Sequence, residues 1–171
     1  LTSMRPLIEA VAVGMAERIR QGGKIMVCGN GGSAGDAQHF AAELVNRFMR
    51  ERRPYAGLAL TTDSSVLTSI GNDYDFAQVF SKQVEALGRK GDVLLAVSTS
   101  GNAANVCRAV ESAKAAGLWT VALCGGKGGA LAKLADEVLC VASSGVTARI
   151  QEGHIMVIHA LCQIVEEKMA E

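Results

Sequence analysis

The sequence lacks an excess of either charge. Its 171 residues carry 17 basic and 17 acidic side chains, so the formal net charge is zero. A protein that binds nucleic acid or an anionic membrane needs a surplus of Lys and Arg, and this composition argues against both partners. No apolar run approaches the roughly 18–20 residues of a membrane span, and no secretory signal stands at the start.

Paired cysteines are also absent. The five cysteines are an odd number and none forms a CxxC pair, which is unlike the disulfide framework of a secreted domain. We therefore expect reduced thiols and a cytoplasmic protein. Proline is scarce at 2 residues and aromatic residues make up 4%, yet 49% of the chain is hydrophobic, so disorder is excluded. Because the chain begins at Leu1 rather than Met, we expect part of the natural N-terminus to be missing.

Segments of helical and strand character alternate along the chain. Apolar residues at helical spacing, with glycine as a stop signal, predict helices over 4–21, 34–50, 63–69, 76–87, 103–116, 131–135 and 146–169. Short apolar runs predict strands over 24–28, 57–60, 92–97, 118–123 and 137–141. Strands that are apolar throughout and alternate with helices indicate a parallel sheet covered on both faces. We therefore predict one doubly wound α/β domain over residues 1–171.

Two half-units of this pattern resemble each other, because each has a strand, a small polar turn and a helix. The turns are GNGGS at 29–33 and STSGN at 98–102. In open parallel sheets ligands bind beyond the carboxyl ends of the strands, so both turns should meet at one crevice. A helix N-terminus offers free N–H groups that suit a phosphate. The first turn also fits a loose dinucleotide pattern, but the acidic residue expected after the second strand is absent there, and neither turn continues as GK[ST].

A second pattern concerns the three histidines. His39 and Glu43 are four residues apart on a predicted helix and share one face, just after the first turn. His154 and His159 both lie on the last predicted helix. A single His or Glu on a helix is usually a solvated or core residue, but a pair beside a phosphate-type turn favours a functional site.

Together these motifs resemble a known family. The segments CGNGGSAGDAQHFAAEL and LLAVSTSGNAANV resemble the sugar isomerase (SIS) domain family. With IGND and RIQEGHIMVIH they resemble the bacterial sedoheptulose 7-phosphate isomerases, also called phosphoheptose isomerases, from about Gly22 to the C-terminus. The resemblance implies a five-stranded parallel sheet of order 2-1-3-4-5, a cytoplasmic homotetramer and one zinc ion per subunit. It also implies that the missing start held more of an N-terminal helical segment used in assembly.

The resemblance further implies the reaction and its residues. The reaction interconverts D-sedoheptulose 7-phosphate and D-glycero-D-manno-heptose 7-phosphate through a cis-enediol, as the first step of ADP-heptose precursor synthesis for lipopolysaccharide or other surface glycans. The implied metal ligands are His39, Glu43, Gln151 and His159. The implied substrate contacts are Asn30, Gly31, Gly32, Ser33, Asn72, Asp73, Ser98, Thr99, Ser100 and Gln151.

The chemistry needs a base that moves a proton between C1 and C2 and an acid that manages the oxygens. Glu43 is the expected base, and His159 is the matching acid and base, since imidazole gives and takes protons near neutral pH. Arg47, one turn beyond Glu43, could meet an anionic or hydroxylated substrate or form a surface salt bridge. Ala103 stands where the family pattern has a further serine, so one hydroxyl contact to the phosphate is lost. His154 is expected to be a structural or interface residue.

A different class of protein remains an alternative. Some SIS-domain proteins are non-catalytic regulators that bind a phosphosugar and a protein partner such as a replication initiator. Such relatives keep the fold and the phosphate turns but need not keep the metal and acid–base set. This chain fills all four of those positions, which favours the enzyme.

The last predicted helix also bears on assembly. From Ile155 to Val165 it is apolar on most faces, so a second subunit should cover part of it. Gln151 and His159 are eight residues apart, about 12 Å along a regular helix, which is far for two ligands of one ion. Either Gly153 loosens the start of this helix or Gln151 of one subunit joins His159 of another. We expect the second arrangement, in which catalysis requires the oligomer.

Overall fold

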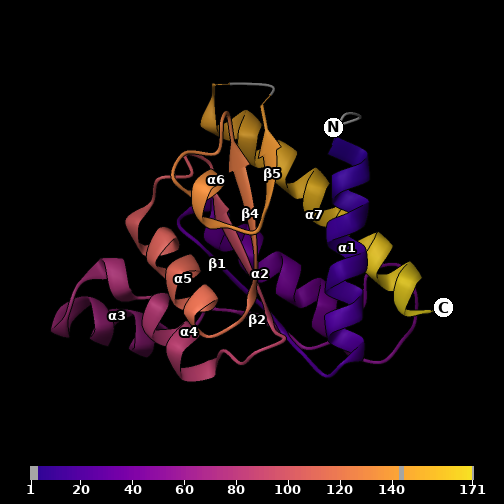
Figure 1. Ribbon diagram of the computed structural model, residues 1–171, viewed down its shortest axis with the longest axis horizontal. Helices are drawn as coiled ribbons and strands as arrows, with labels where there is room; N and C mark the ends of the chain where they lie inside the picture. The colour runs from indigo at the N-terminus through magenta and orange to yellow at the C-terminus, as the bar shows by residue number, and fades with distance from the viewer. Residues whose placement is uncertain (1–3, 143–144, 171) are drawn as a thin grey trace.

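Five parallel strands form one sheet in the order β2-β1-β3-β4-β5 (Figure 1), and this confirms the predicted fold class. The computed structural model describes residues 4–142 and 145–170. The strands are β1 (Ile25–Gly29), β2 (Gly57–Ala59), β3 (Val93–Ser98), β4 (Trp119–Gly125) and β5 (Glu137–Val141). The helices are α1 (Arg5–Arg20), α2 (Gly32–Val45), α3 (Ser64–Asp73), η2 (Phe76–Gln78), α4 (Ser81–Leu87), α5 (Ala104–Ala115), α6 (Leu131–Leu134) and α7 (Thr147–Met169).

Alternating strand residues build two cores, one on each face of the sheet. In β3, Leu95 and Val97 pack with α1, α2 and α7, while Leu94 and Ala96 pack with α4, α5 and α6. The central strands β1 and β3 are buried along their whole length. Helices on both faces and fully apolar central strands are the arrangement that the sequence predicts.

The helix predicted over 34–50 is wrong at its C-terminal end. α2 begins at Gly32 and ends at Val45, so residues 46–50 are not helical. The backbone N–H groups of residues 48–50 donate to the carboxylate of Glu166 on α7, and Arg52 donates to the carbonyls of Glu43 and Leu44. These partners replace the hydrogen bonds that a longer helix would have made.

The segment after β2 also differs from its prediction. Residues 70–73, which lie outside the helix predicted over 63–69, form the last turn of α3, whose N-terminus is capped by Asp63. The single helix expected over 76–87 is split into η2 and α4, because the Asp75 side chain accepts from the N–H of Ala77 and starts a separate short turn.

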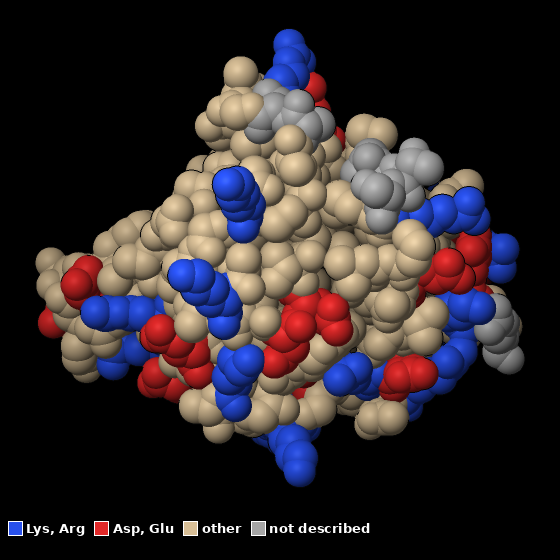
Figure 2. Space-filling view, turned by 45° about the horizontal axis from the view of Figure 1, so that its top comes forward, with Lys and Arg blue, Asp and Glu red and all other residues tan. Residues whose placement is uncertain are grey.

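The other expected elements are present with shifts of one or two residues at their ends. Among the described helices, none has both the length and the apolar composition needed to cross a membrane. On the face shown in Figure 2, basic and acidic side chains are interspersed.

Candidate functional site

The two polar turns meet at one end of the sheet. The first follows β1 and the second follows β3, and these strands pair directly in parallel register. A cavity of about 160 Å³ lies between the turns, and five of the predicted substrate contacts line it together with Val97 and Ala103. These five are Asn30, Ser33, Ser98, Thr99 and Ser100.

The first turn reaches the helix through a glycine. Gly31 is the N-cap of α2 and has a φ of 54°, a conformation that glycine adopts without strain. The carbonyls of Asn30 and Gly31 accept from the N–H groups of Ser33 and Ala34, which closes the turn at the start of α2. The cavity therefore lies at a helix N-terminus, where an anion is favoured.

The second turn is held by its own hydroxyl groups. The Ser98 hydroxyl oxygen accepts from the N–H of Gly101, and the Ser100 hydroxyl oxygen accepts from the N–H of Asn102, both at 3.2 Å. Each hydroxyl can still donate a hydrogen bond to a bound oxyanion, because a hydroxyl is both donor and acceptor.

A pair of amides joins the two turns. Asn30 Nδ2 donates to Asn105 Oδ1 and Asn105 Nδ2 donates to Asn30 Oδ1, both at 2.8 Å. Asn105 is 3% exposed and lies in the first turn of α5. The sequence analysis did not select Asn105, and its position shortly after the second turn is the only signal that marks it.

A second cluster lies on α2 and α7. His39 Nε2 is 2.9 Å from His159 Nε2 and 3.5 Å from Glu43 Oε1, so one chain brings these three residues together. The Phe48 ring lies 5.5 Å from the His159 ring, centroid to centroid. The side chains of His39 and Glu43 are 41% and 23% exposed, which leaves them accessible to a ligand.

Gln151 lies elsewhere on α7. A Cβ atom built on Gly32 would be 2.1 Å from Gln151 Nε2, so the glutamine amide packs directly over this glycine. Gly32 precedes His39 by seven residues of α2, which is about 10 Å along a helix. α7 therefore runs beside α2. Gln151 lies next to the N-terminus of α2, and His159 lies next to His39 further along both helices.

Comparisons with known proteins agree with this geometry. The SIS domain family matches residues 2–125. A phosphoheptose isomerase from Roseiflexus sp. is 51% identical over all of this chain and 86% of its own length. One from Campylobacter jejuni is 56% identical over 90% of this chain and 82% of its own length.

This chain belongs to the phosphoheptose isomerases of the SIS-domain family.

Solved structures support the same assignment. The phosphoheptose isomerase of Neisseria gonorrhoeae is 51% identical, with a TM-score of 0.88 over 95% of this chain and 86% of that chain. That of Francisella tularensis is 44% identical, with a TM-score of 0.91 over the same shares. The family's aldose–ketose isomerase activity and its fold therefore apply to this chain.

The expectation that Gln151 of one subunit joins His159 of another stays a prediction, because the structure describes one chain. His39, Glu43 and His159 are close to one another within one chain. α7 is continuous through Gly153, so this glycine does not loosen its start.

Other predicted contacts do not reach the cavity in this chain. Arg47 lies beyond the end of α2, so the argument that it shares a helix face with Glu43 is wrong. Its guanidinium lies 3.6 Å from Glu51 on the surface, which is the salt bridge that the sequence analysis gave as the alternative to a substrate contact. Asn72 and Asp73 are exposed at the end of α3 and hydrogen-bond to each other at 2.8 Å.

Two further polar residues are buried, Asp36 near His39 on α2 and His154 on α7. Asp36 is 7% exposed and its Oδ2 has no hydrogen-bond partner among the described residues. Burial raises the pKa of this carboxyl, and nearby His39 partly offsets the rise. His154 is fully buried, as a structural histidine would be. Burial lowers the pKa of His154, while the Cys124 backbone opposes the shift.

The histidine cluster offers suitable donors for a zinc ion. Two donors bound to one tetrahedral zinc at about 2.0–2.1 Å stand roughly 3.3–3.4 Å apart. The nitrogen–nitrogen distance of 2.9 Å and the nitrogen–oxygen distance of 3.5 Å are close to this value. Across the described residues no three His, Cys, Asp or Glu side chains form a complete metal centre. The donor types fit zinc, and the two distances from His39 are close to those of a tetrahedral site.

Proposed function

We propose that this chain interconverts D-sedoheptulose 7-phosphate and D-glycero-D-manno-heptose 7-phosphate at the crevice between its two turns. The observation that carries the proposal is the convergence of His39, Glu43 and His159 in one chain that also has a cavity lined by hydroxyl groups at a helix N-terminus. The phosphate occupies that cavity, where Ser98, Thr99 and Ser100 provide hydroxyl donors. The sugar extends toward α7.

The isomerisation is a balanced exchange of two protons. Glu43 takes the proton from C1 of the ketose while His159 gives a proton to the oxygen on C2, which yields the cis-enediol. Glu43 then returns its proton to C2, and the hydroxyl on C1 gives its proton to His159. The aldose forms and both side chains regain their starting states, as general acid–base catalysis requires.

The amide of Gln151 lies over Gly32, at the N-terminus of α2. This position suits a hydrogen bond to a sugar hydroxyl between the phosphate cavity and the histidine cluster. Gln151 is thereby a substrate contact in this chain, and its role as a metal ligand is implied by the family alone.

A zinc ion is part of the proposal. His39, Glu43 and His159 would hold it, with Gln151 as the fourth ligand implied by the family. When bound it would supply positive charge that polarises the sugar oxygens.

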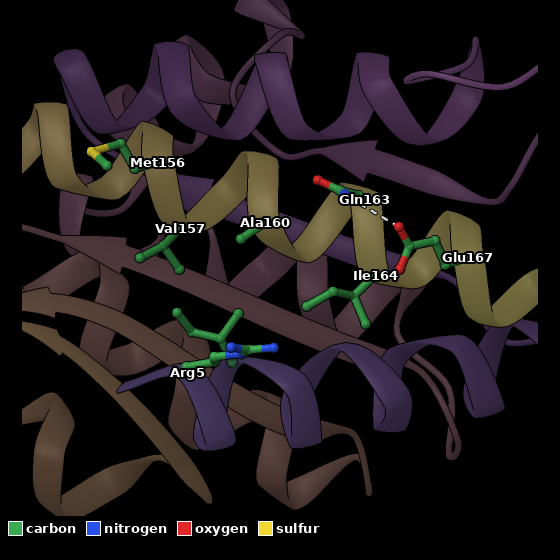
Figure 3. Close-up of a pocket in the computed structure, with 8 residues that line it drawn as sticks. Arg5, Met156, Val157, Ala160, Gln163, Ile164 and Glu167 are labelled. Atoms are coloured by element: carbon green, nitrogen blue, oxygen red, sulfur yellow. Dashed lines mark hydrogen bonds between the residues drawn. The ribbon is translucent and has the colours of Figure 1, made fainter. Parts of the chain in front are cut away.

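We also propose a homo-oligomer, a tetramer by family resemblance. A groove between α1 and α7 is lined by five apolar residues and by the polar side chains of Arg5, Gln163 and Glu167 (Figure 3). Met156 on its rim is 58% exposed. α3 has no buried residue, and Tyr74 and Phe76 beyond it are 62% and 60% exposed.

A second copy that covers α3 would bring Asn72 and Asp73 of one subunit toward the crevice of another. This arrangement would explain why both residues stand in the family motif although they lie away from the cavity of their own chain. Light scattering at micromolar concentration tests the assembly, and a monomer would contradict it.

The five cysteines are free thiols in the structure, which supports a reducing compartment such as the cytoplasm. A regulatory protein without activity is the alternative function. The names of the relatives at 51–56% identity favour the enzyme.

Turnover of sedoheptulose 7-phosphate by the Glu43→Gln chain tests the proposal. We expect a loss of at least a thousandfold in kcat with the fold and assembly retained, because the amide cannot accept the C1 proton. Glu51→Gln is the matched control, since Glu51 is an exposed carboxylate six residues after the end of α2. Near-normal turnover by Glu43→Gln would remove Glu43 from the mechanism, and an inactive wild-type chain would favour the regulator.

A further inference from the structure

A buried carboxylate stands beyond the histidine cluster on α7. Glu166 is 3% exposed and follows His159 by seven residues, which places it two helical turns further along the same side. Its Oε1 accepts from the N–H of Phe48 at 3.1 Å, and its Oε2 accepts from the N–H groups of Met49 and Arg50 at 2.9 Å. The Arg52 guanidinium adds a fourth hydrogen bond at 3.1 Å. One carboxylate therefore fixes the chain that follows α2.

These hydrogen bonds keep Glu166 ionised in the interior. Burial alone raises the pKa of its carboxyl group. The N–H groups of Met49, Phe48 and Arg50 and the side chain of Arg52 outweigh that effect and lower the pKa below its ordinary value. A buried carboxylate with this many donors holds a single geometry.

Arg52 connects the carboxylate to the end of α2. Its Nη1 donates to the carbonyl of Leu44 at 2.8 Å, and its Nη2 donates to the carbonyl of Glu43 at 2.6 Å. The guanidinium also stacks over the Tyr55 ring at 3.9 Å. The last carbonyls of a helix lack partners within the helix, and here an arginine satisfies them.

Glu166 and Arg52 each make a contact that leads to one of the two expected proton-transfer residues, His159 and Glu43. On one side, Glu166 holds the backbone of Phe48, whose ring lies 5.5 Å from the His159 ring. On the other side, Arg52 holds the backbone carbonyl of Glu43. The Glu166–Arg52 pair is 4% and 10% exposed at its side chains, so water does not compete for these contacts.

We propose that Glu166 and Arg52 are positioning residues for the isomerisation, which hold Glu43 and His159 in the geometry needed for proton transfer. This inference rests on the roles proposed above for Glu43 and His159. Neither Glu166 nor Arg52 touches the reacting atoms. Their effect passes through the Phe48 ring and through the end of α2.

The chain offers a matched control at the other end of the sheet. Asp92 is 4% exposed, accepts from the backbone N–H groups of Lys24 and Arg89 at 2.9 Å, and pairs with the Lys24 ammonium group. It precedes β3, at the amino ends of the strands and away from the cavity. Asp92→Asn therefore disturbs a similar buried ion pair without reaching the site.

Steady-state kinetics and thermal unfolding of Glu166→Gln and Asp92→Asn test the proposal. We expect both variants to lose Tm. We expect Glu166→Gln to lose at least tenfold in kcat with KM within twofold of wild type, and Asp92→Asn to keep kcat within twofold. Equal kcat values in the two variants would show that Glu166 is structural only.

Arg52→Lys is the second variant, in case Glu166→Gln does not fold. Lysine keeps the positive charge beside Glu166 but lacks the planar fork that reaches the carbonyls of Glu43 and Leu44. We expect a drop of at least fivefold in kcat with the fold intact, and an unchanged kcat would overturn the proposal.

Nuclear magnetic resonance of the His159 ring separates this inference from the proposed function. The ring protons of His159 should shift in Glu166→Gln and stay in place in Asp92→Asn, whatever substrate the enzyme uses. If the wild-type chain failed to convert sedoheptulose 7-phosphate, the proposed function would be wrong. The shift of the His159 ring protons would still test the positioning role. Unmoved His159 resonances in a folded Glu166→Gln chain would overturn the positioning role.

Discussion

Replacement of Gly32 by alanine separates the function of Gln151 from the stability of α2. Gly32 is the first residue of α2 and does not have a positive φ, so alanine fits the backbone. The new Cβ would stand 2.1 Å from Gln151 Nε2 and 2.8 Å from Gln151 Cδ. The amide must then retreat by more than 1 Å to reach an ordinary contact. Because the amide is the end of a flexible side chain, the fold should hold.

The expected loss is in activity. Misplacement of a positioned group by about 1 Å can cost roughly a hundredfold in rate, and a hundredfold corresponds to about 2.7 kcal/mol of transition-state stabilisation. We therefore expect kcat/KM to fall by about two orders of magnitude. The free energy of unfolding should stay level or rise by up to about 1 kcal/mol, since glycine is the more flexible residue in the unfolded chain.

Gly35→Ala is the control on the same helix. A Cβ built on Gly35 meets nothing within 4 Å, so this variant should gain helix stability and keep full activity. The double variant Gly32→Ala/Gln151→Ala should be no less active than Gln151→Ala alone, because the displaced group is already gone. Full activity in Gly32→Ala would refute the functional placement of the Gln151 amide over the N-terminus of α2.

Three further predictions follow from the site and its surroundings. Ser98→Ala combined with Ser100→Ala should raise KM for the phosphorylated ketose with a smaller change in kcat, and an unchanged KM would exclude the second turn as the phosphate site. An equal mixture of Glu43→Gln and His159→Ala chains should stay inactive after subunit exchange, because both residues belong to the same chain's site; recovered activity would contradict this. The pKa of His154 is lower in the folded chain than its value of about 6.5 in the unfolded chain. The neutral histidine therefore contributes its full stability above about pH 6.5, and this contribution is lost as the pH falls toward the pKa of the folded state. Tm should therefore fall between about pH 7 and 5.5 in wild type and fall less in His154→Leu, and identical slopes would rule out this histidine as the cause.

The sequence predicts the meeting of the two turns because parallel strands end at the same edge of a sheet. This argument needs only the strands at β1 and β3 and the small polar residues after them. The strand order came from the family resemblance, since periodicity alone does not order strands.

The end of α2 could not be predicted in the same way. Asn46 to Arg50 contain no proline or glycine, so local signals let the helix continue. The partner that ends it is Glu166, which lies 118 residues after Phe48 in the sequence. Likewise, the partner of Asn30 is Asn105, 75 residues away, and only the folded chain brings the two amides together.

The distance between Gln151 and His159 along α7 was predicted correctly from their spacing. Gln151 and His159 are far apart on a regular helix, as the spacing indicates. α2 runs beside α7 and places Gly32 next to Gln151 and His39 next to His159, so the two histidines meet within one chain. Helix packing of this kind cannot be predicted from one helix alone.

Deuterium incorporation during turnover in D₂O tests the central claim most directly. Wild type should convert sedoheptulose 7-phosphate to the aldose with solvent deuterium at C2, because a proton held by Glu43 exchanges with water before it returns to carbon. Glu43→Gln should give neither product nor deuterated ketose. An aldose free of deuterium, formed as fast by Glu43→Gln as by wild type, would contradict both the enediol and the role of Glu43.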